Sequence, residues 1–486
     1  MKKILSCGIA MASMVMLSGL RLHAQTYNFS LVSQTQMAPG VIYQNYSATT
    51  PHPQQIYVLQ VDLKDPTIKL QSAKAGDVIN GGVLTVKQIA ASKDVNGSYH
   101  NVIGAINGDF YVTSGTAEGN PQNVFVPDGQ VFAEKTGTPR SIFGISDNNV
   151  PFISLRSENF RVTRGGVSRT IQKINGSRTT DTLVLYNQLK GTSTGTDNTG
   201  TEVKLGLASG AAWKANSPVS CVVLARQAGV GNMSYSPGQA VLSGKGTEAT
   251  YLNGYNVGDN VTVQLDVASN ASNILQVMGG LAMLDSAGHN IGSSRIYKEG
   301  ADTAADTTHN PHTAVGISQD GRFLYMVVVD GRRPATRFGM NITEFGDLML
   351  YLGAYDALNL DGGWSSTLVA NNVGKNTPSD PSGDERSVGT ALLAYSATRL
   401  LDDFETSEGH FDQAPTYTLG TQYTQGISTT STLDRVTTNA CSGSASERAV
   451  LNDDASVSTP WTVRLLSGSG LPANNVKITS DGTLSF

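Results

Sequence analysis

One stretch of the chain, Asn359 to Thr367, concentrates residue types that do chemistry. It places a carboxylate, Asp361, before two glycines, and the hydroxyls of Ser365 and Ser366 follow closely. The apolar run before Asp361 predicts a buried strand, and the glycines allow a sharp turn and a close approach of a ligand. Rigid scaffolds tend to carry functional groups at such positions. The same residues also fit an ordinary tight turn, in which Asp and Ser bond their own backbone.

Two further apolar runs end in the same way. Residues 102–106 run into Asn107-Gly108-Asp109, and residues 323–329 run into Asp330-Gly331-Arg332-Arg333. A polar segment, His309 to Gly316, precedes the second run. If the strands share one sheet, their turns converge at one rim and bring together three carboxylates, two arginines, a histidine and an asparagine.

This set of residue types fits a substrate that is both a sugar and a phosphate. A glycosidic bond needs one group that protonates the leaving oxygen and one that activates water or attacks, and carboxylates do both. Arginine suits a phosphate because its planar fork donates to two oxygens. The sequence therefore predicts catalytic carboxylates at Asp361, Asp330 and Asp109. Ser365 and Ser366 are predicted to donate hydrogen bonds to substrate, because residues 363–367 do not fit Gly-x-Ser-x-Gly.

The elements that would position these turns are mostly strands. Strand patterns cover residues 55–63, 102–106 and 323–329. Helix signals are fewer: one lies at residues 85–92, and a better one covers 343–353, with Asn341 or Thr343 as cap and a glycine as stop. Few helices among many strands favour an α+β domain built around a mixed sheet.

Composition divides the 486-residue chain into three parts. Residues 1–24 combine two lysines, an apolar run and a small-residue site, which predicts an export signal. A membrane anchor is the alternative, although the run is short for a span. Beyond residue 400 the chain is rich in Thr, Ser and Gly and strand-patterned. Residues 401–486 therefore predict a β-sandwich, incomplete because such modules have about 100 residues.

Charge and cysteine content exclude some classes of protein. The net charge is -5 and no basic run is present, which argues against nucleic acid as a partner. No segment after the signal is expected to span a membrane, so we expect a secreted or periplasmic protein. Only Cys221 and Cys441 would remain there, far apart in sequence. A disulfide framework is therefore not expected.

The turns together resemble the phosphodiester glycosidase family. The family pattern runs through an Ile-Asn-Gly turn, an Arg-Thr-Ala-Val-Gly segment, a Val-Asp-Gly-Arg turn, a Leu-Asp-Gly-Gly-Gly-Ser-Ser loop and a later Asn and Arg. This chain matches in order with Ile106–Tyr111, His312–Gly316, Val329–Arg332, Leu360–Ser366, Asn376 and Arg386–Val388. The resemblance implies that residues 25–400 form an exported hydrolase domain. It would cleave the glycosidic bond of a sugar-1-phosphodiester, similar to N-acetylglucosamine-1-phosphodiester, in a glycan or glycolipid.

The resemblance also implies a substrate-binding set. Its members are Asn107, Gly108, His312, Thr313, Arg332, Gly362, Gly363, Trp364, Ser365, Ser366, Asn376 and Arg386. Three positions depart from the family: His312 stands where Arg is usual, Asp109 replaces a Gly, and Trp364 replaces the third Gly. They exchange a permanent cation for a titratable one, add a carboxylate, and add an aromatic face that could stack on a sugar. We expect them to affect substrate choice more than reaction type.

Two other functions fit the same residues. A glycan-binding protein could keep the fold and lose catalysis through the three departures, and a phosphodiesterase would cut on the phosphate side. No cofactor is expected to be required, and metal dependence stays open. Residues 380–385 are acidic and a weak candidate for Ca²⁺, but they do not fit an EF-hand loop. Residues 403–405, 409–411 and 464–468 resemble galactose-binding-like sandwiches.

Overall fold

The computed structural model of the protein describes residues 27–94, 101–132, 138–300, 307–396, 428, 430–437 and 446–452. The signal predicted at 1–24 lies outside these residues, and so does most of the sandwich predicted at 401–486. Of that sandwich the described part contains one antiparallel pair, β24 (Thr432–Val436) and β25 (Ser446–Val450). No helix in the described ranges has the length and apolar character needed to cross a membrane.

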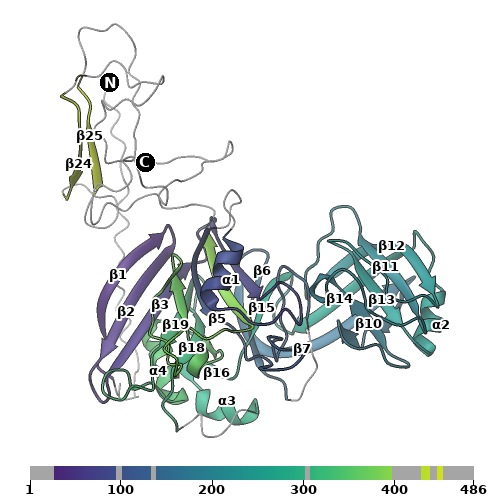
Figure 1. Ribbon diagram of the computed structural model, residues 1–486, viewed down its shortest axis with the longest axis horizontal. Coiled ribbons are helices and arrows are strands. Elements are labelled where there is room, and N and C mark those ends of the chain that lie inside the picture. The colour runs from purple at the N-terminus through teal and green to yellow at the C-terminus, as the bar shows by residue number, and fades with distance from the viewer. Residues whose placement is uncertain are drawn as a thin grey trace.

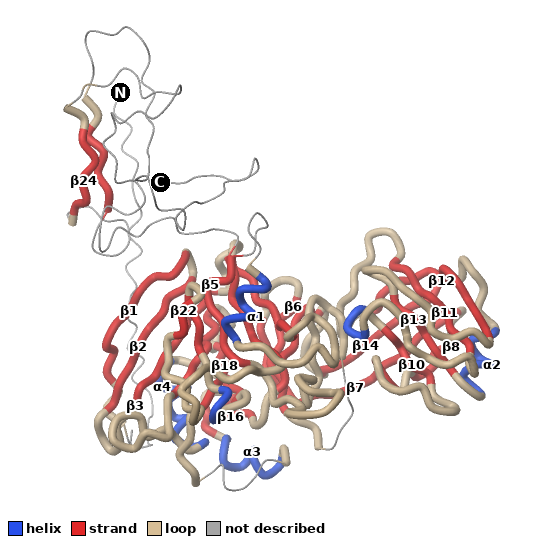
Figure 2. Tube along the Cα trace, in the orientation of Figure 1, coloured by secondary structure: helices blue, strands red, loops and turns tan. Residues whose placement is uncertain are grey.

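Three sheets account for the rest of the described strands (Figures 1 and 2). The eight-stranded sheet has the order β1 (Ser30–Ala38), β2 (Val41–Ala48), β3 (Gln54–Asp62), β19 (Phe323–Val329), β18 (His312–Ile317), β20 (Asp356–Asn359), β16 (Met283–Ser286) and β17 (His289–Asn290). The five-stranded sheet has the order β22 (Val373–Gly374), β21 (Leu368–Ala370), β5 (Asn101–Asn107), β23 (Thr390–Ser396) and β4 (Ile68–Lys74). All pairs in both sheets are antiparallel.

The third sheet has ten strands. Its order is β15 (Ile274–Gly279), β6 (Ser141–Ser146), β7 (Pro151–Arg164), β14 (Asn260–Ala268), β12 (Pro218–Ala228), β11 (Thr201–Leu207), β13 (Ala240–Gly244), β10 (Leu183–Tyr186) and β9 (Lys173–Ile174), with β8 (Val167–Thr170) on β7. Figure 1 shows β10 to β14 as a separate lobe reached through the long strand β7. The helices of the described residues are α1 (Val86–Lys93), α2 (Thr247–Asn253), α3 (Gly292–Lys298) and α4 (Ile342–Leu352). A mostly β chain with four helices in its described part is consistent with the predicted α+β class.

The strand-end turns do not share one sheet, so the condition considered from the sequence is not fulfilled. The Asn107 turn follows β5 in the five-stranded sheet, whereas the Asp330 and Asp361 turns follow β19 and β20 in the eight-stranded sheet. The two sheets pack against each other through one apolar core. Within this core Leu59 of β3 packs against Gly104 of β5, where an added Cβ would lie 2.3 Å from Leu59 Cδ1. The turns still meet, because strands of both facing sheets end at the same edge of this core.

Local sequence signals explain the best-defined helix. Asn341 accepts a hydrogen bond from the backbone of Glu344, whose side chain accepts one from the Asn341 backbone in return. This capping box satisfies donors that would otherwise be unpaired at the helix start. Gly353 ends the helix in the left-handed conformation, with φ 104°. The apolar face of α4 covers the outer side of the eight-stranded sheet and places Met340 and Phe345 near the candidate site.

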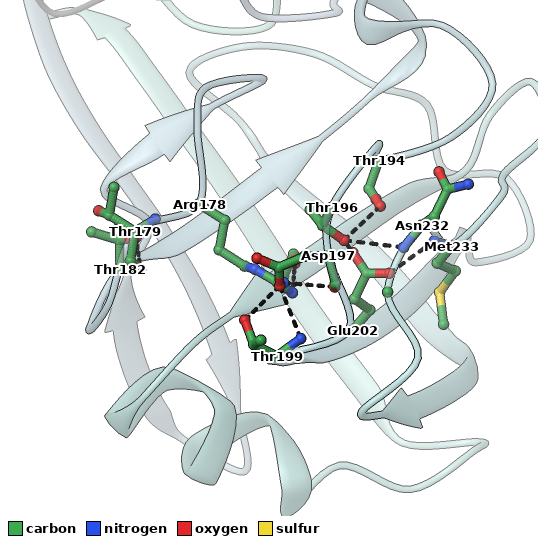
Figure 3. Close-up of polar contacts among 12 residues, drawn as sticks. Arg178, Thr179, Thr182, Thr194, Thr196, Asp197, Thr199, Glu202, Asn232 and Met233 are labelled. Atoms are coloured by element: carbon green, nitrogen blue, oxygen red, sulfur yellow. Dashed lines mark hydrogen bonds and ion pairs between the residues drawn. The ribbon is translucent and has the colours of Figure 1, made fainter.

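A polar network holds the loop before β11 in the separate lobe (Figure 3). The buried Glu202 accepts hydrogen bonds from Thr196 Oγ1 at 2.9 Å and from the Met233 backbone at 2.8 Å. Arg178 pairs with Asp197 at 2.6 Å and reaches Ser243 at 3.1 Å. Each buried polar group in this network therefore has a partner, which is the condition for tolerating it in a β-core.

Candidate active site

The peptide group of Asp361 is held from both sides by the other sheet. Asn107 Nδ2 donates to the Asp361 carbonyl at 2.6 Å, and the Asp361 N–H donates to the Gly108 carbonyl at 3.0 Å. Asp361 follows β20, whereas Asn107 and Gly108 end β5. The two facing sheets are therefore joined directly at the residue that carries the candidate carboxylate.

Asn107 acts as a hub in this contact. It is fully buried, and its Oδ1 accepts hydrogen bonds from Thr313 Oγ1 at 2.7 Å and from the Thr367 backbone at 3.1 Å. Its Nδ2 and its Oδ1 both bond within the protein, so Asn107 and Thr313 help to position the loop, and their predicted role in substrate binding stays a prediction. Gly108 leaves no room for a side chain, since an added Cβ would lie 2.5 Å from Thr390 Oγ1.

The Asp361 carboxyl has the electrostatics of an acid–base group. Burial raises its pKa from 3.8 to about 6. Ser365, Arg386 and the Gly362 backbone act in the opposite direction, because they favour the charged form. The residue keeps partial access to solvent. A carboxyl with a pKa near neutrality changes protonation state over the range in which most enzymes work.

Two arginines converge on the indole of Trp364 beside this carboxyl. The guanidinium carbon of Arg332 lies 5.5 Å from the ring centroid and that of Arg386 lies 5.6 Å from it. Arg386 is also 5.8 Å from the ring of Tyr111. Arg332 Nε donates to Asn310 Oδ1 at 3.1 Å. Neither arginine forms an ion pair with a carboxylate of the described residues, and such guanidinium groups are suited to an anionic ligand.

Three consecutive hydroxyls line the loop that follows. Ser365, Ser366 and Thr367 are buried; the Ser365 hydroxyl lies beside the Asp361 carboxyl, and the hydroxyl oxygens of Ser366 and Thr367 have no hydrogen-bond partner among the described residues. The short turn Gly363–Ser365 puts them there, with Gly363 at φ 62° and its N–H donating to the Pro311 carbonyl at 2.9 Å. Buried polar groups without partners are costly, and a substrate hydroxyl or phosphate oxygen would satisfy them.

The carboxylate of Asp330 is bonded to other groups of the protein. It is buried, and its oxygens accept hydrogen bonds from Tyr57 at 3.3 Å, from Asn376 at 3.2 Å and from the Thr377 backbone. Arg337 forms an ion pair with it at 3.1 Å. Asn376 in turn donates to the Ser366 carbonyl at 2.9 Å. Asp330 and Asn376 therefore hold the loop that carries Ser365 and Ser366 through the Ser366 carbonyl.

Asp109 is also withdrawn from solvent. Its two oxygens accept hydrogen bonds from the Asn123 backbone at 2.9 Å and side chain at 3.2 Å. Burial raises its pKa to about 7, Asn123 and Arg140 oppose that effect, and the charge of Asp361 adds to it. Asp109 and Asp330 are thus buried and bonded within the protein, and their catalytic roles stay predictions, because a strand-end pattern does not distinguish an accessible acid from a buried one.

His312 does not replace the cation that the family pattern has at this position. Its Nε2 lies 2.9 Å from the Met340 carbonyl and its Nδ1 lies 3.2 Å from Asn359 Oδ1. Both of these oxygens only accept, so a neutral ring can donate a hydrogen bond to one of them and not to the other. Burial lowers the pKa of His312 to about 4, against the effect of these two contacts. The ring is neutral at pH 7 and stacks on Phe345.

Part of the chain matches the model of a known protein family. Residues 217–395 match the family model described as phosphodiester glycosidase. The matched segment includes Asp330, Asp361 and Arg386, whereas Asn107 and Asp109 lie before it. No curated protein matches the chain.

Three solved structures are similar to this chain. A Synechocystis protein has a TM-score of 0.55 at 18% identity, covering 76% of this chain and 64% of its own. The present chain thus spans less than two thirds of that relative. A Burkholderia pseudomallei protein named as an export candidate has a TM-score of 0.48 at 23% identity, and the alignment covers 71% of this chain and 74% of that protein. The third is the catalytic domain of zebrafish N-acetylglucosamine-1-phosphodiester α-N-acetylglucosaminidase, auto-inhibited by its pro-peptide. Its TM-score is 0.40 at 14% sequence identity, and the alignment covers 76% of this chain and 87% of that domain. Only the first supports a shared fold.

The phosphodiester glycosidase motifs did not reveal several residues that build the site. Arg337 and Asn123 hold Asp330 and Asp109 and stand outside any motif, whereas Asn310, which bonds Arg332, lies in the polar segment that begins at His309. Tyr111 was part of a quoted motif, and its buried ring beside Arg386 could have been inferred from it. Within the described residues, no three His, Cys, Asp or Glu side chains are grouped so that they could hold a metal ion. In the acidic loop, Asp380 accepts hydrogen bonds from Ser382.

Proposed function

We propose that this protein is an exported phosphodiester glycosidase that hydrolyses the glycosidic bond of a sugar-1-phosphodiester. The substrate is part of a glycan or glycolipid, and its sugar is N-acetylglucosamine or a similar residue. One observation carries the proposal: a single accessible carboxyl, Asp361, lies beside two arginines that have no carboxylate partner among the described residues. The family match of residues 217–395 supports the reaction type.

The arginines bind the phosphate and stabilise it as the leaving group. A phosphate monoester has a second pKa near 6, so it leaves as a stable anion. Arg332 and Arg386 offset the charge that develops on its oxygens, which is a large effect in a partly water-excluded site. Such a leaving group needs less protonation than a sugar alkoxide does. The buried state of Asp330 and Asp109 is compatible with this chemistry, because a second, proton-donating carboxyl is not essential.

Asp361 acts as the general base. Its ionised carboxylate takes a proton from water, the water oxygen bonds to the anomeric carbon, and the bond from that carbon to the phosphate oxygen breaks. The products are a free sugar and a phosphate monoester, and the proton held by Asp361 returns to solvent. The hydroxyls of Ser365 and Ser366 orient the substrate. Asn107, Thr313 and Asp330 hold these groups in place, and no metal ion is required.

The test is a product analysis. Methyl phosphodiesters of several sugar 1-phosphates are incubated with the exported protein, recovered from the medium or periplasm, and free reducing sugar is measured with and without a chelator. We expect sugar release that the chelator does not reduce and that Asp361→Asn abolishes, whereas Asp384→Asn, an exposed carboxylate in the neighbouring loop, retains it. Release of sugar phosphate and methanol would identify a phosphodiesterase, and binding without any product would identify a glycan-binding protein.

A further inference from the structure

We infer that Trp364 is a positioning residue that holds Arg332 and Arg386 together as a phosphate-binding pair. This inference rests on the proposed function, and it gives Trp364 a different role from the sugar-stacking platform that its residue type predicts. The distances of 5.5 and 5.6 Å from the two guanidinium carbons to the ring centroid are both within the range of about 6 Å for cation–π attraction.

The guanidinium groups of Arg332 and Arg386 repel each other, so a third group is needed to hold them together. The charge of Arg386 is among the causes that lower the pKa of Arg332, after burial, so the two guanidinium groups are close enough to repel each other. No carboxylate of the described residues pairs with either of them. An electron-rich indole face attracts both without neutralising them. The pair thus keeps its full charge for a ligand.

The backbone around the indole favours the same arrangement. Arg332 has φ 60° and Gly363 has φ 62°, both in the left-handed region. A Cβ added to Gly363 would lie 3.0 Å from Arg332 Nη2, so the glycine leaves the space that this guanidinium occupies. A non-glycine residue in this region costs on the order of 1 kcal/mol or more and persists where the surroundings enforce it.

The free donors define what the pair can bind. Arg332 uses its Nε on Asn310, which leaves its terminal amino groups, and Arg386 donates no hydrogen bond within the described part of the chain. A phosphodiester has two non-bridging oxygens, one for each guanidinium. The indole itself is 41% exposed, but its surface is shared by two cations and offers little face to a sugar ring. Loss of Trp364 should therefore reduce phosphate affinity and leave free-sugar affinity unchanged.

The test measures ligand binding without turnover. Inorganic phosphate and free N-acetylglucosamine are titrated by calorimetry against the full chain and the variants Trp364→Ala and Trp364→Phe. Loss of two cation–π contacts predicts about fivefold to thirtyfold weaker phosphate binding in Trp364→Ala, and the phenyl ring of Trp364→Phe should restore most of it. Tyr297→Ala, which removes an exposed aromatic on α3, is the matched control and should bind phosphate as the parent does.

A double-mutant cycle separates positioning from simple loss of stability. If Trp364 acts through Arg386, Trp364→Ala should cost much less phosphate affinity in an Arg386→Ala background than in the parent. Unchanged phosphate affinity in Trp364→Ala, or a loss confined to the free sugar, would overturn the inference. Phosphate binding that depends on Trp364, in a protein that releases no sugar from any phosphodiester, would overturn the proposed function alone.

Discussion

Asp361→Asn should make the protein inactive and, at neutral pH, more stable. Burial raises the pKa of Asp361 from 3.8 to about 6. This difference of about 2 corresponds to about 3 kcal/mol that the ionised carboxylate costs the folded state, at about 1.36 kcal/mol per pKa unit. Solvent reaches the side chain in part and screens the effect, so we expect about 1–2 kcal/mol. Asparagine has nearly the same shape and cannot ionise.

The pH dependence of this gain has a definite sign. The folded protein binds the Asp361 proton more tightly than the unfolded chain does, so the parent loses stability as pH rises from about 4 to about 6. Above pH 6 the loss is complete. The stability of Asp361→Asn relative to the parent should therefore be greatest above pH 6 and vanish near pH 3.5. Sugar release by the parent should rise as the pH passes through about 6, because the base must be ionised in the folded protein.

Urea denaturation between pH 4 and pH 8 measures the difference in the free energy of unfolding between Asp361→Asn and the parent. Asp384→Asn is the control and should have the stability of the parent at every pH. The midpoint is compared at unchanged slope, so that a change in the unfolded state is not mistaken for stability. A variant less stable than the parent at pH 7, or a stability difference independent of pH, would refute the electrostatic account of Asp361. Full sugar release by the variant would refute its role as base.

Three further substitutions test the surroundings. Asn107→Ala should destabilise by about 3 kcal/mol and strongly reduce activity, since three hydrogen bonds are lost and buried partners stay unpaired; urea denaturation and sugar release measure both. Gly108→Ala should destabilise by about 1–3 kcal/mol through overpacking against Thr390, measured in the same way. Asp285→Asn should stabilise the folded protein, and more at pH 8 than at pH 5. Burial, then the charges of Asp347 and Asp356, raise the pKa of Asp285 to about 9, and neither carboxyl oxygen has a hydrogen-bond partner among the described residues. Urea denaturation at both pH values measures the difference in stability.

The sequence predicted the local elements better than their arrangement. Residues 323–329 form a strand and α4 ends at Gly353, because apolar runs, caps and glycine stops act within a few residues. Whether the Asn107 turn shares a sheet with Asp361 could not be predicted, since a run buried on both faces does not specify its sheet. The carboxylate roles also depend on distant partners: Asn123 and Arg337 decide that Asp109 and Asp330 are held by the protein, and neither is near them in sequence.

The clamp on Asp361 makes the spacing of two sheets a determinant of catalysis. Its carbonyl and its N–H are bound by Asn107 and Gly108 of the opposite sheet, and the core between the sheets contains close contacts such as that of Leu59 with Gly104. A homologue could keep every motif residue and still lose activity through one larger side chain in this core. Conversely, a core substitution that moves the sheets by a fraction of an ångström could tune the rate without touching the site. Motif inspection alone is therefore insufficient to identify active members among such proteins.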